Sequence, residues 1–159
     1  MEIKKYQTSV NSILDNFVSN EINNEKMKDI INWSLKGGKR LRSMIVIDIT
    51  NTMNKINNTI IDNSKASISC EFLHTASLII DDLPCMDNDN YRRGIETVHY
   101  KYGSDNAYLI SSFMVSQVLK LLKENIDDMK KIFNLDYVNK IQEKILNNYV
   151  MNYNIAILG

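Results

Sequence analysis

The chain has 159 residues, of which 19 are basic and 19 acidic, so its formal net charge is zero. This length is enough for one domain with a hydrophobic core. The balanced charge argues against nucleic acid as the main partner, because nucleic-acid-binding domains usually carry a basic excess. It also argues against strongly electrostatic association with a membrane surface.

The cysteines and the hydropathy pattern indicate a cytoplasmic protein. Cys70 and Cys85 form neither a disulfide framework nor a CxxC metal pair, so we expect reduced thiols. The most apolar stretch, 107–122, is interrupted by polar residues and falls short of the ~20 apolar residues that a bilayer requires. The N-terminus turns polar before an apolar signal core could form, so no signal peptide is predicted.

Apolar residues recur mostly three or four positions apart, which is typical of amphipathic helices. No stretch alternates with period two over the length of a strand, so we predict an all-α fold in a single domain over residues 1–159. The predicted helices span residues 3–18, 24–35, 39–53, 60–82, 104–123 and 137–159. The asparagine-rich segment 54–59 is predicted to be a loop, and the segment 83–97 to be irregular.

A glycine pair and a basic run separate the second and third predicted helices, in the order Gly37-Gly38-Lys39-Arg40-Leu41-Arg42. Glycines allow the backbone to approach a ligand closely, and the start of the next helix offers N–H groups and a positive dipole end. Lys39 and Arg42 are three positions apart and so share a helix face. By itself the segment fits a helix end followed by solvated basic residues, but beside an acidic metal site it predicts a second anion site.

An acidic cluster follows the fourth predicted helix. Its aspartates, with the arginine pair that comes next, are Asp81, Asp82, Asp87, Asp89, Arg92 and Arg93. Carboxylates this dense repel one another unless a cation lies among them. Mg²⁺ prefers oxygen ligands and is usually held by one or two carboxylates together with substrate phosphates. Arginine offers forked donors that suit phosphate, so the cluster predicts a metal-diphosphate site.

Helical spacing supports this interpretation. His74 lies seven residues before Asp81, and Ser77 lies four before it, so all three fall on nearly the same helix face. Pro84 cannot continue the helix, and a bulge there can bring Asp87 back toward Asp81. His74 could equally be a core histidine whose ring nitrogens are both hydrogen-bonded, but its alignment with Asp81 favours a role facing a ligand.

Ala76 and Ser77 lie directly behind the acidic residues, on the helix that would wall a pocket leading away from the diphosphate. Small side chains there leave room for a long apolar tail, and they equally suit close helix packing.

The run that begins at Asp87 also resembles the start of an EF-hand calcium loop. Tyr91, Arg92 and Val98 stand where that loop needs an oxygen ligand, a glycine and a glutamate, so calcium is excluded.

These motifs closely resemble those of the trans-isoprenyl diphosphate synthases, the family that makes geranyl, farnesyl and geranylgeranyl diphosphates. The segment 37–42 resembles the GGKRLR motif, and the segment 71–89 resembles the first aspartate-rich motif in its DDxxxxD form. The resemblance extends from about Gly37 to Gly103. It implies the N-terminal half of the isoprenoid synthase helical bundle.

The resemblance also implies a reaction and assigns roles to residues. Mg²⁺ would promote loss of diphosphate from an allylic substrate, and the double bond of isopentenyl diphosphate would attack the resulting carbocation. The residues implied to be catalytic and metal-binding are Asp81, Asp82 and Asp87. Those implied to bind the two diphosphate substrates are Lys39, Arg42, His74, Arg92 and Arg93. Because Ala76 and Ser77 are not aromatic, the expected product is geranylgeranyl diphosphate or longer.

The chain departs from the family pattern at several positions. Ile80 replaces a usual histidine, Ile95-Glu96 replaces a usual Lys-Pro, and Ser111-Ser112 stands where Gly-Asp is common. A second aspartate-rich motif is missing, because the run Asp127-Asp128-Met-Lys-Lys lacks the third carboxylate of such a motif.

We therefore expect a partial prenyl synthase that needs complementary helices, either as a fragment or as one half of a split enzyme. The alternative is a non-catalytic regulatory subunit that binds a full-length synthase. Both hypotheses predict an exposed apolar surface and a homo- or hetero-oligomer. A helical interaction module with coincidental motifs is a third hypothesis, which the ordered motifs disfavour.

Overall fold

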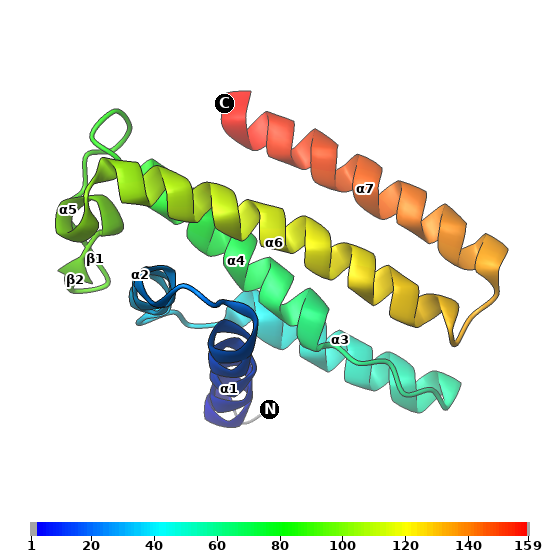
Figure 1. The fold of residues 1–159 in the computed structure, drawn as a ribbon. Coiled ribbons are helices and arrows are strands. Elements are labelled where there is room, and N and C mark those ends of the chain that lie inside the picture. Colours follow the sequence, from blue (N-terminus) through cyan, green and yellow to red (C-terminus); the bar gives the residue numbers. More distant parts are fainter. Residues whose placement is uncertain (1–2, 159) are drawn as a thin grey trace. The chain divides into compact units, whose positions relative to one another are not determined.

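The computed structural model describes residues 3–158, with side chains described as far as Met151. These residues form seven helices and one short β-hairpin (Figure 1), which confirms the predicted all-α class. The elements are α1 (Ile3–Glu21), α2 (Glu25–Leu35), α3 (Leu41–Asn57), α4 (Ser64–Asp81), β1 (Tyr91–Arg92), β2 (Ile95–Glu96), α5 (Val98–Tyr102), α6 (Ser104–Lys130) and α7 (Leu135–Leu158). Among the described helices, none combines the length and apolar character needed to cross a membrane.

The chain divides into two compact units, one ending at Leu122 and the other starting at Lys123. The first contains α1 to α5, most of α6 and every residue of the predicted site. The second contains the end of α6 and α7. In it, Lys123 pairs with Asp127 at 2.8 Å, and the rings of Phe133 and Tyr137 lie 6.3 Å apart.

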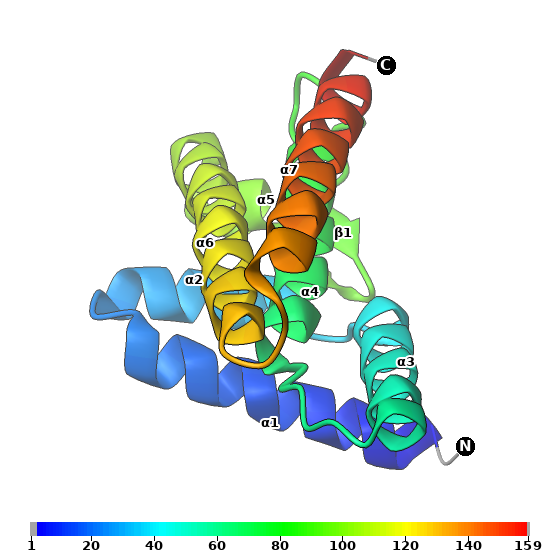
Figure 2. The ribbon, with the colours of Figure 1, turned by 90° about the vertical axis from the view of Figure 1, so that its right-hand side faces the viewer.

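Helix α4 occupies the middle of the first unit and packs against α1, α2 and α3 (Figure 2). Phe72 on α4 is fully buried and meets Phe17 of α1 edge-on, with ring centroids 5.4 Å apart. Burying an aromatic side chain of this kind stabilises the fold by about 1.5–3 kcal/mol. On the α3 side, the hydroxyl of Ser43 donates to the carbonyl of Ser67 at 2.7 Å. Small residues thus allow close contact of α3 and α4.

The asparagine-rich segment was predicted to be a loop over 54–59, and this is wrong, because α3 continues to Asn57. Asn58 ends the helix in the left-handed region at φ 50°, a conformation that asparagine tolerates. The side chain of Asn54 then accepts from the Ile61 N–H at 2.9 Å and from the Thr59 hydroxyl at 3.0 Å. Asparagine here ends a helix by capping, which composition alone does not distinguish from a loop.

Other boundaries also shift. Helix α2 begins after Asn24, whose side chain accepts from the Met27 N–H at 3.0 Å. Helix α4 begins at Ser64 rather than at residue 60, and α6 runs on to Lys130. The last predicted helix begins at Leu135, and its final predicted residue, Gly159, lies outside the described residues.

The segment 83–97 was predicted to be irregular, but it contains the hairpin of β1 and β2. Tyr91 pairs with Glu96, and Arg92 pairs with Ile95. The two turn residues, Arg93 and Gly94, have φ of 55° and 78°, and positive φ at both positions suits the twist of a two-residue hairpin. Strands of two residues are too short to show a period-two pattern, so they cannot be recognised from the sequence.

Helix α3 exposes an apolar stripe. Its members, which we call the α3 apolar face, are Leu41, Ile45, Ile49, Met53 and Ile56. Each is between 48% and 70% exposed. They recur every three or four residues along the helix, so they form one continuous surface.

Candidate functional site

The acidic residues lie at the end of α4 and in the turn that follows. The N–H of Asp87 donates to the carbonyl of Asp81 at 2.8 Å, and the carbonyl of buried Leu83 accepts from Met86 and Asn88 at 2.9 and 3.0 Å. The chain therefore turns back after the helix. The predicted return of Asp87 toward Asp81 is confirmed at the level of the backbone.

The three aspartates predicted to bind metal have different surroundings. Asp82 is buried, and its Oδ1 accepts from Arg92 Nε at 2.7 Å and lies 2.6 Å from Arg92 Nη2. That hydrogen bond is the main cause that raises the pKa of Arg92. Asp81 is half-buried and Asp87 is exposed. Asp82 is thus already neutralised by a partner.

Two accessible carboxylates, together with substrate phosphates, fit the way in which Mg²⁺ is usually held. Asp81 and Asp87 supply such a pair next to the backbone turn. Within the described part of the chain, no three His, Cys, Asp or Glu side chains converge in a way that could hold a metal ion. With one or two carboxylates as ligands, Mg²⁺ fills its other positions with water and phosphate oxygens.

Basic groups surround His74 on the neighbouring face of α4. Burial lowers the pKa of His74, and the positive charges of Arg42, Arg93 and Arg92 lower it further, while Glu71 acts in the opposite direction. These couplings place side chains from α3, α4 and the hairpin in one electrostatic neighbourhood. An imidazole held neutral among arginines is suited to accept or donate a hydrogen bond to an anion.

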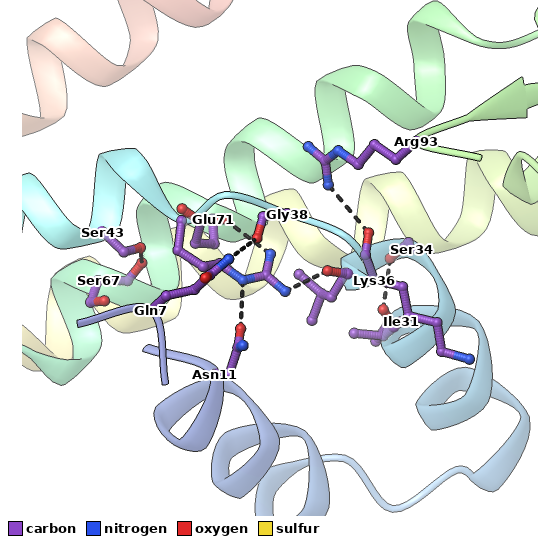
Figure 3. A network of polar contacts seen from close by, with 12 residues as sticks. Gln7, Asn11, Ile31, Ser34, Lys36, Gly38, Ser43, Ser67, Glu71 and Arg93 are labelled. Carbon is purple, nitrogen blue, oxygen red and sulfur yellow. Dashed lines mark hydrogen bonds and ion pairs between the residues drawn. The ribbon is translucent and has the colours of Figure 1, made fainter. Parts of the chain in front are cut away.

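The glycine loop and the hairpin turn lie against each other (Figure 3). Arg93 Nη1 lies 3.5 Å from the Lys36 carbonyl, and a Cβ at Gly37 would lie 3.3 Å from Arg93 Cβ. Burial lowers the pKa of Arg93, and the charges of Arg40 and Arg92 lower it further. The structure therefore brings together the two basic segments that the sequence separates. Lys39 of the same loop is exposed.

A small pocket opens between α2, the end of α4 and the hairpin. Its lining includes Trp33, Lys36, Asp82, Arg92, Arg93 and Glu96. The pocket is the concave part of this basic region.

The two residues predicted to set product length occupy different environments. Ala76 is buried, and its carbonyl accepts from the Ser111 hydroxyl of α6 at 3.1 Å. Ser77 is exposed, and its hydroxyl donates to the His74 carbonyl at 2.9 Å. Ala76 thus belongs to the packing of α4 against α6, and Ser77 is the accessible one. Ser111, a departure from the family pattern, supplies the linking hydroxyl.

Sequence reasoning missed two residues that shape the site. Arg40 is buried and pairs with Glu71 of α4 at 3.2 Å, although the sequence presented it as one of several basic residues. The only tryptophan, Trp33, donates from Nε1 to the Glu96 carbonyl at 2.9 Å. The Lys101 Nζ lies 3.0 Å from the centre of the same ring. The uniqueness of Trp33 was a usable signal, whereas nothing in the sequence distinguishes Arg40 from its neighbours.

Known proteins match this chain over most of its length. A family model described as polyprenyl synthetase matches residues 24–151. A farnesyl diphosphate synthase from Buchnera aphidicola is 40% identical over 107 residues, which cover 67% of this chain and 36% of the relative. A chloroplastic protein of Arabidopsis thaliana, the large subunit 1 of a heterodimeric geranylgeranyl pyrophosphate synthase, is 39% identical over 92 residues. The match covers 57% of this chain and 24% of that protein.

Solved structures show the same fold. A geranyltransferase from Legionella pneumophila superposes with a TM-score of 0.73 at 25% identity, covering 89% of this chain and 48% of that one. An FPP/GFPP synthase from Zymomonas mobilis gives a TM-score of 0.70 at 23% identity, covering 94% of this chain and 53% of that one. The matched part is the N-terminal half. This chain thus spans about half of these solved chains and about a third of the curated relatives.

Proposed function

Because this chain belongs to the polyprenyl synthetase family, we propose that it takes part in the Mg²⁺-dependent condensation of isopentenyl diphosphate with an allylic diphosphate. The observation that carries the proposal is the juxtaposition of the two halves of the site. The Asp81–Asp87 turn lies at the end of the helix whose His74 is coupled to Arg42, Arg92 and Arg93. Carboxylates for a cation thus lie at the end of α4, while arginines for phosphate come from α3 and the hairpin.

Each residue has a proposed task. Asp81 and Asp87 would hold Mg²⁺, which when bound would stabilise the negative charge of the departing diphosphate. Asp82 assists by fixing Arg92, to which it is bonded, and Arg92 contacts the allylic diphosphate. Lys39, Arg42, His74 and Arg93 hold isopentenyl diphosphate. Arginine forks and a neutral imidazole would orient the two diphosphates for reaction.

We propose a geranylgeranyl or longer product, because neither Ala76 nor Ser77 is a bulky residue that would block an apolar tail. The exposed position of Ser77 supports its role more than that of Ala76, which packs against α6. We also propose a cytoplasmic location, and Cys70 and Cys85, which are free thiols, are compatible with it.

The chain spans about a third of its curated relatives, so we propose that activity requires complementary helices in a homo- or hetero-oligomer. The second candidate function is that of a non-catalytic subunit of a full-length synthase. The name of the Arabidopsis relative, which describes that protein as part of a heterodimer, supports an assembly of unlike chains.

The test has two stages. Calorimetry first measures binding of inorganic pyrophosphate with and without Mg²⁺. We expect Mg²⁺ to strengthen binding and the Asp81→Asn and Asp87→Asn variants to lose that effect. The control is Asp15→Asn, an exposed carboxylate on α1. Binding that is indifferent to Mg²⁺, or to the loss of Asp81, would contradict the proposed metal site.

The second stage incubates the chain with Mg²⁺, isopentenyl diphosphate and farnesyl diphosphate, with Asp81→Ala as control. Elongated product that disappears in the control would mean that this chain is sufficient for the reaction. If no product forms, adding a C-terminal half from a relative should restore turnover if the chain is a catalytic half. If the chain instead changes the product length of an added full-length synthase, the result would favour the regulatory function.

A further inference from the structure

Arg40 differs from the other basic residues of its loop. It is only 7% exposed, whereas Lys39 and Arg42 on either side are exposed. It stands just before α3 with φ of 59°, a left-handed conformation. Arginine has no intrinsic preference for that region, so the surrounding contacts must hold it there.

The Arg40 guanidinium joins three helices. Its Nε donates to the Asn11 side chain of α1 at 2.8 Å, its Nη1 to Glu71 of α4 at 3.2 Å, and its Nη2 to the Leu35 carbonyl at the end of α2. A Cβ at Gly38 would collide with this guanidinium. The second glycine of the loop therefore leaves room for an arginine of the protein itself.

The loop is held from its other side as well. The Gln7 side chain of α1 donates to the Gly38 carbonyl at 3.1 Å. Glu71 is only 3% exposed, so the Arg40–Glu71 pair is a buried ion pair. Such pairs add little net stability, because desolvating two charges offsets their attraction, and fixing a geometry is their best-supported use.

We propose that Arg40 is a positioning residue for the diphosphate site. Its buried contacts fix the loop 36–40 and the start of α3. Lys39 of the loop and Arg42 of α3 are thereby held near the hairpin turn that carries Arg93. The link to diphosphate rests on the proposed function. The link to loop order does not, and it can be tested without any ligand.

The decisive variant is the double substitution Arg40→Gln with Glu71→Gln. The single Arg40→Gln change leaves a buried carboxylate without its partner and should lower the midpoint of thermal unfolding. The double variant removes both charges and should recover most of that loss. It cannot reproduce the three-way attachment, because glutamine has one amide group in place of the forked guanidinium.

Two measurements then separate positioning from stability. The first is the rate of trypsin cleavage after Lys36 and Lys39, followed by mass spectrometry well below the unfolding midpoint. The second is the affinity for pyrophosphate with Mg²⁺. In the double variant we expect faster cleavage, because the loop opens more readily without its buried contacts. We expect pyrophosphate affinity to be weaker by roughly tenfold to a hundredfold, as when a group that orients a ligand-binding residue is removed.

Two controls accompany the experiment. Glu25→Gln with Lys28→Gln neutralises an exposed ion pair of α2 and should change neither readout. Val18→Ala, at a fully buried position of α1, should lower the unfolding midpoint without changing pyrophosphate affinity.

The outcomes can be distinguished. A double variant with wild-type cleavage of the loop would overturn the positioning role. If the unmodified chain binds pyrophosphate, a double variant that binds it with the same affinity would also overturn the positioning role. If the unmodified chain does not bind it, while cleavage of the double variant is accelerated, the proposed function fails and the positioning of the loop stands.

Discussion

At the scale of single residues, the aspartates of the site differ in whether they are buried with a charged partner or accessible to a ligand. Asp82 is buried with Arg92 as its partner, while Asp81 is half-buried and Asp87 exposed. Adjacent aspartates can therefore differ in function although their side chains are the same.

We predict that Asp82→Asn lowers the free energy of unfolding by roughly 1–3 kcal/mol, because it removes the charged partner of Arg92 in a buried place. Asp81→Asn should change stability by less than about 0.5 kcal/mol, although it should abolish the Mg²⁺ effect on pyrophosphate binding. Urea unfolding of both variants checks this. Equal destabilisation by the two substitutions would show that the distinction between these aspartates is wrong.

The lowered pKa of His74 predicts that the stability of the fold depends on pH. The pKa of His74 in the folded chain is lowered by burial and by Arg42, while in the unfolded chain it is about 6.5. The unfolded state therefore binds more protons near and below that pH, so stability is fully present above pH of about 6.5 and falls as the pH drops through the folded pKa.

The check compares the free energy of unfolding at pH 5.5 and 7.5 for the wild type and for His74→Gln. We expect a smaller loss at acidic pH in the variant, because the titrating group has been removed. An identical loss in both proteins would mean that His74 does not carry this dependence.

At the scale of elements, the hairpin of β1 and β2 is held by contacts outside its own two residue pairs. Trp33 donates to the Glu96 carbonyl. The buried Thr97 hydroxyl donates to the Asp89 carbonyl at 2.8 Å and lies 3.1 Å from His99 Nδ1. A hairpin this short has little stability of its own, so these bonds determine where Arg92 and Arg93 lie.

We predict that Thr97→Val, which keeps the shape but removes the hydroxyl, costs about 1–2 kcal/mol of stability and weakens pyrophosphate binding. The matched control is Thr52→Val on the exposed side of α3, which should be within about 0.5 kcal/mol of the wild type. Thermal unfolding and calorimetry measure the two effects. If Thr97→Val leaves pyrophosphate affinity unchanged, the hairpin is not fixed through this residue.

At the scale of the whole molecule, the α3 apolar face is the feature that bears on assembly. It starts at Leu41, next to Arg42 of the site, and continues to Ile56. Continuous apolar surfaces of this kind on a soluble chain usually mark an interaction surface. This agrees with the proposal that the chain acts together with further helices.

We predict that the purified chain self-associates at micromolar concentration and that Ile45→Glu with Ile49→Glu shifts it toward monomer. Two charges on that surface would have to be buried in any complex, which is costly. Ser12→Glu with Asn16→Glu is the matched control, because it adds the same charges at the same spacing on exposed positions of α1. Light scattering after gel filtration measures the mass, and equal masses for both pairs would exclude this face.

The sequence by itself determined the helices and the motifs. The recurrence of apolar residues at three- and four-residue spacing depends on local geometry, and the buried residues of α1, which include Val10, Leu14 and Phe17, follow that spacing. The spacing of His74, Ser77 and Asp81 and the break at Pro84 are likewise local, and they indicated a turn that returns Asp87 to Asp81. Segments as short as the hairpin strands carried no such signal.

Only the tertiary structure decided which charged groups are buried. Arg40 lies inside the fold because Asn11 and Glu71 are brought to it from positions 29 and 31 residues away. Asp82 is neutralised because the hairpin returns Arg92 to it, and the carbonyl of buried Ala76 accepts from Ser111 of α6. Charges and small residues appear the same in a sequence whether they face water or a partner, because burial depends on segments that are distant along the chain.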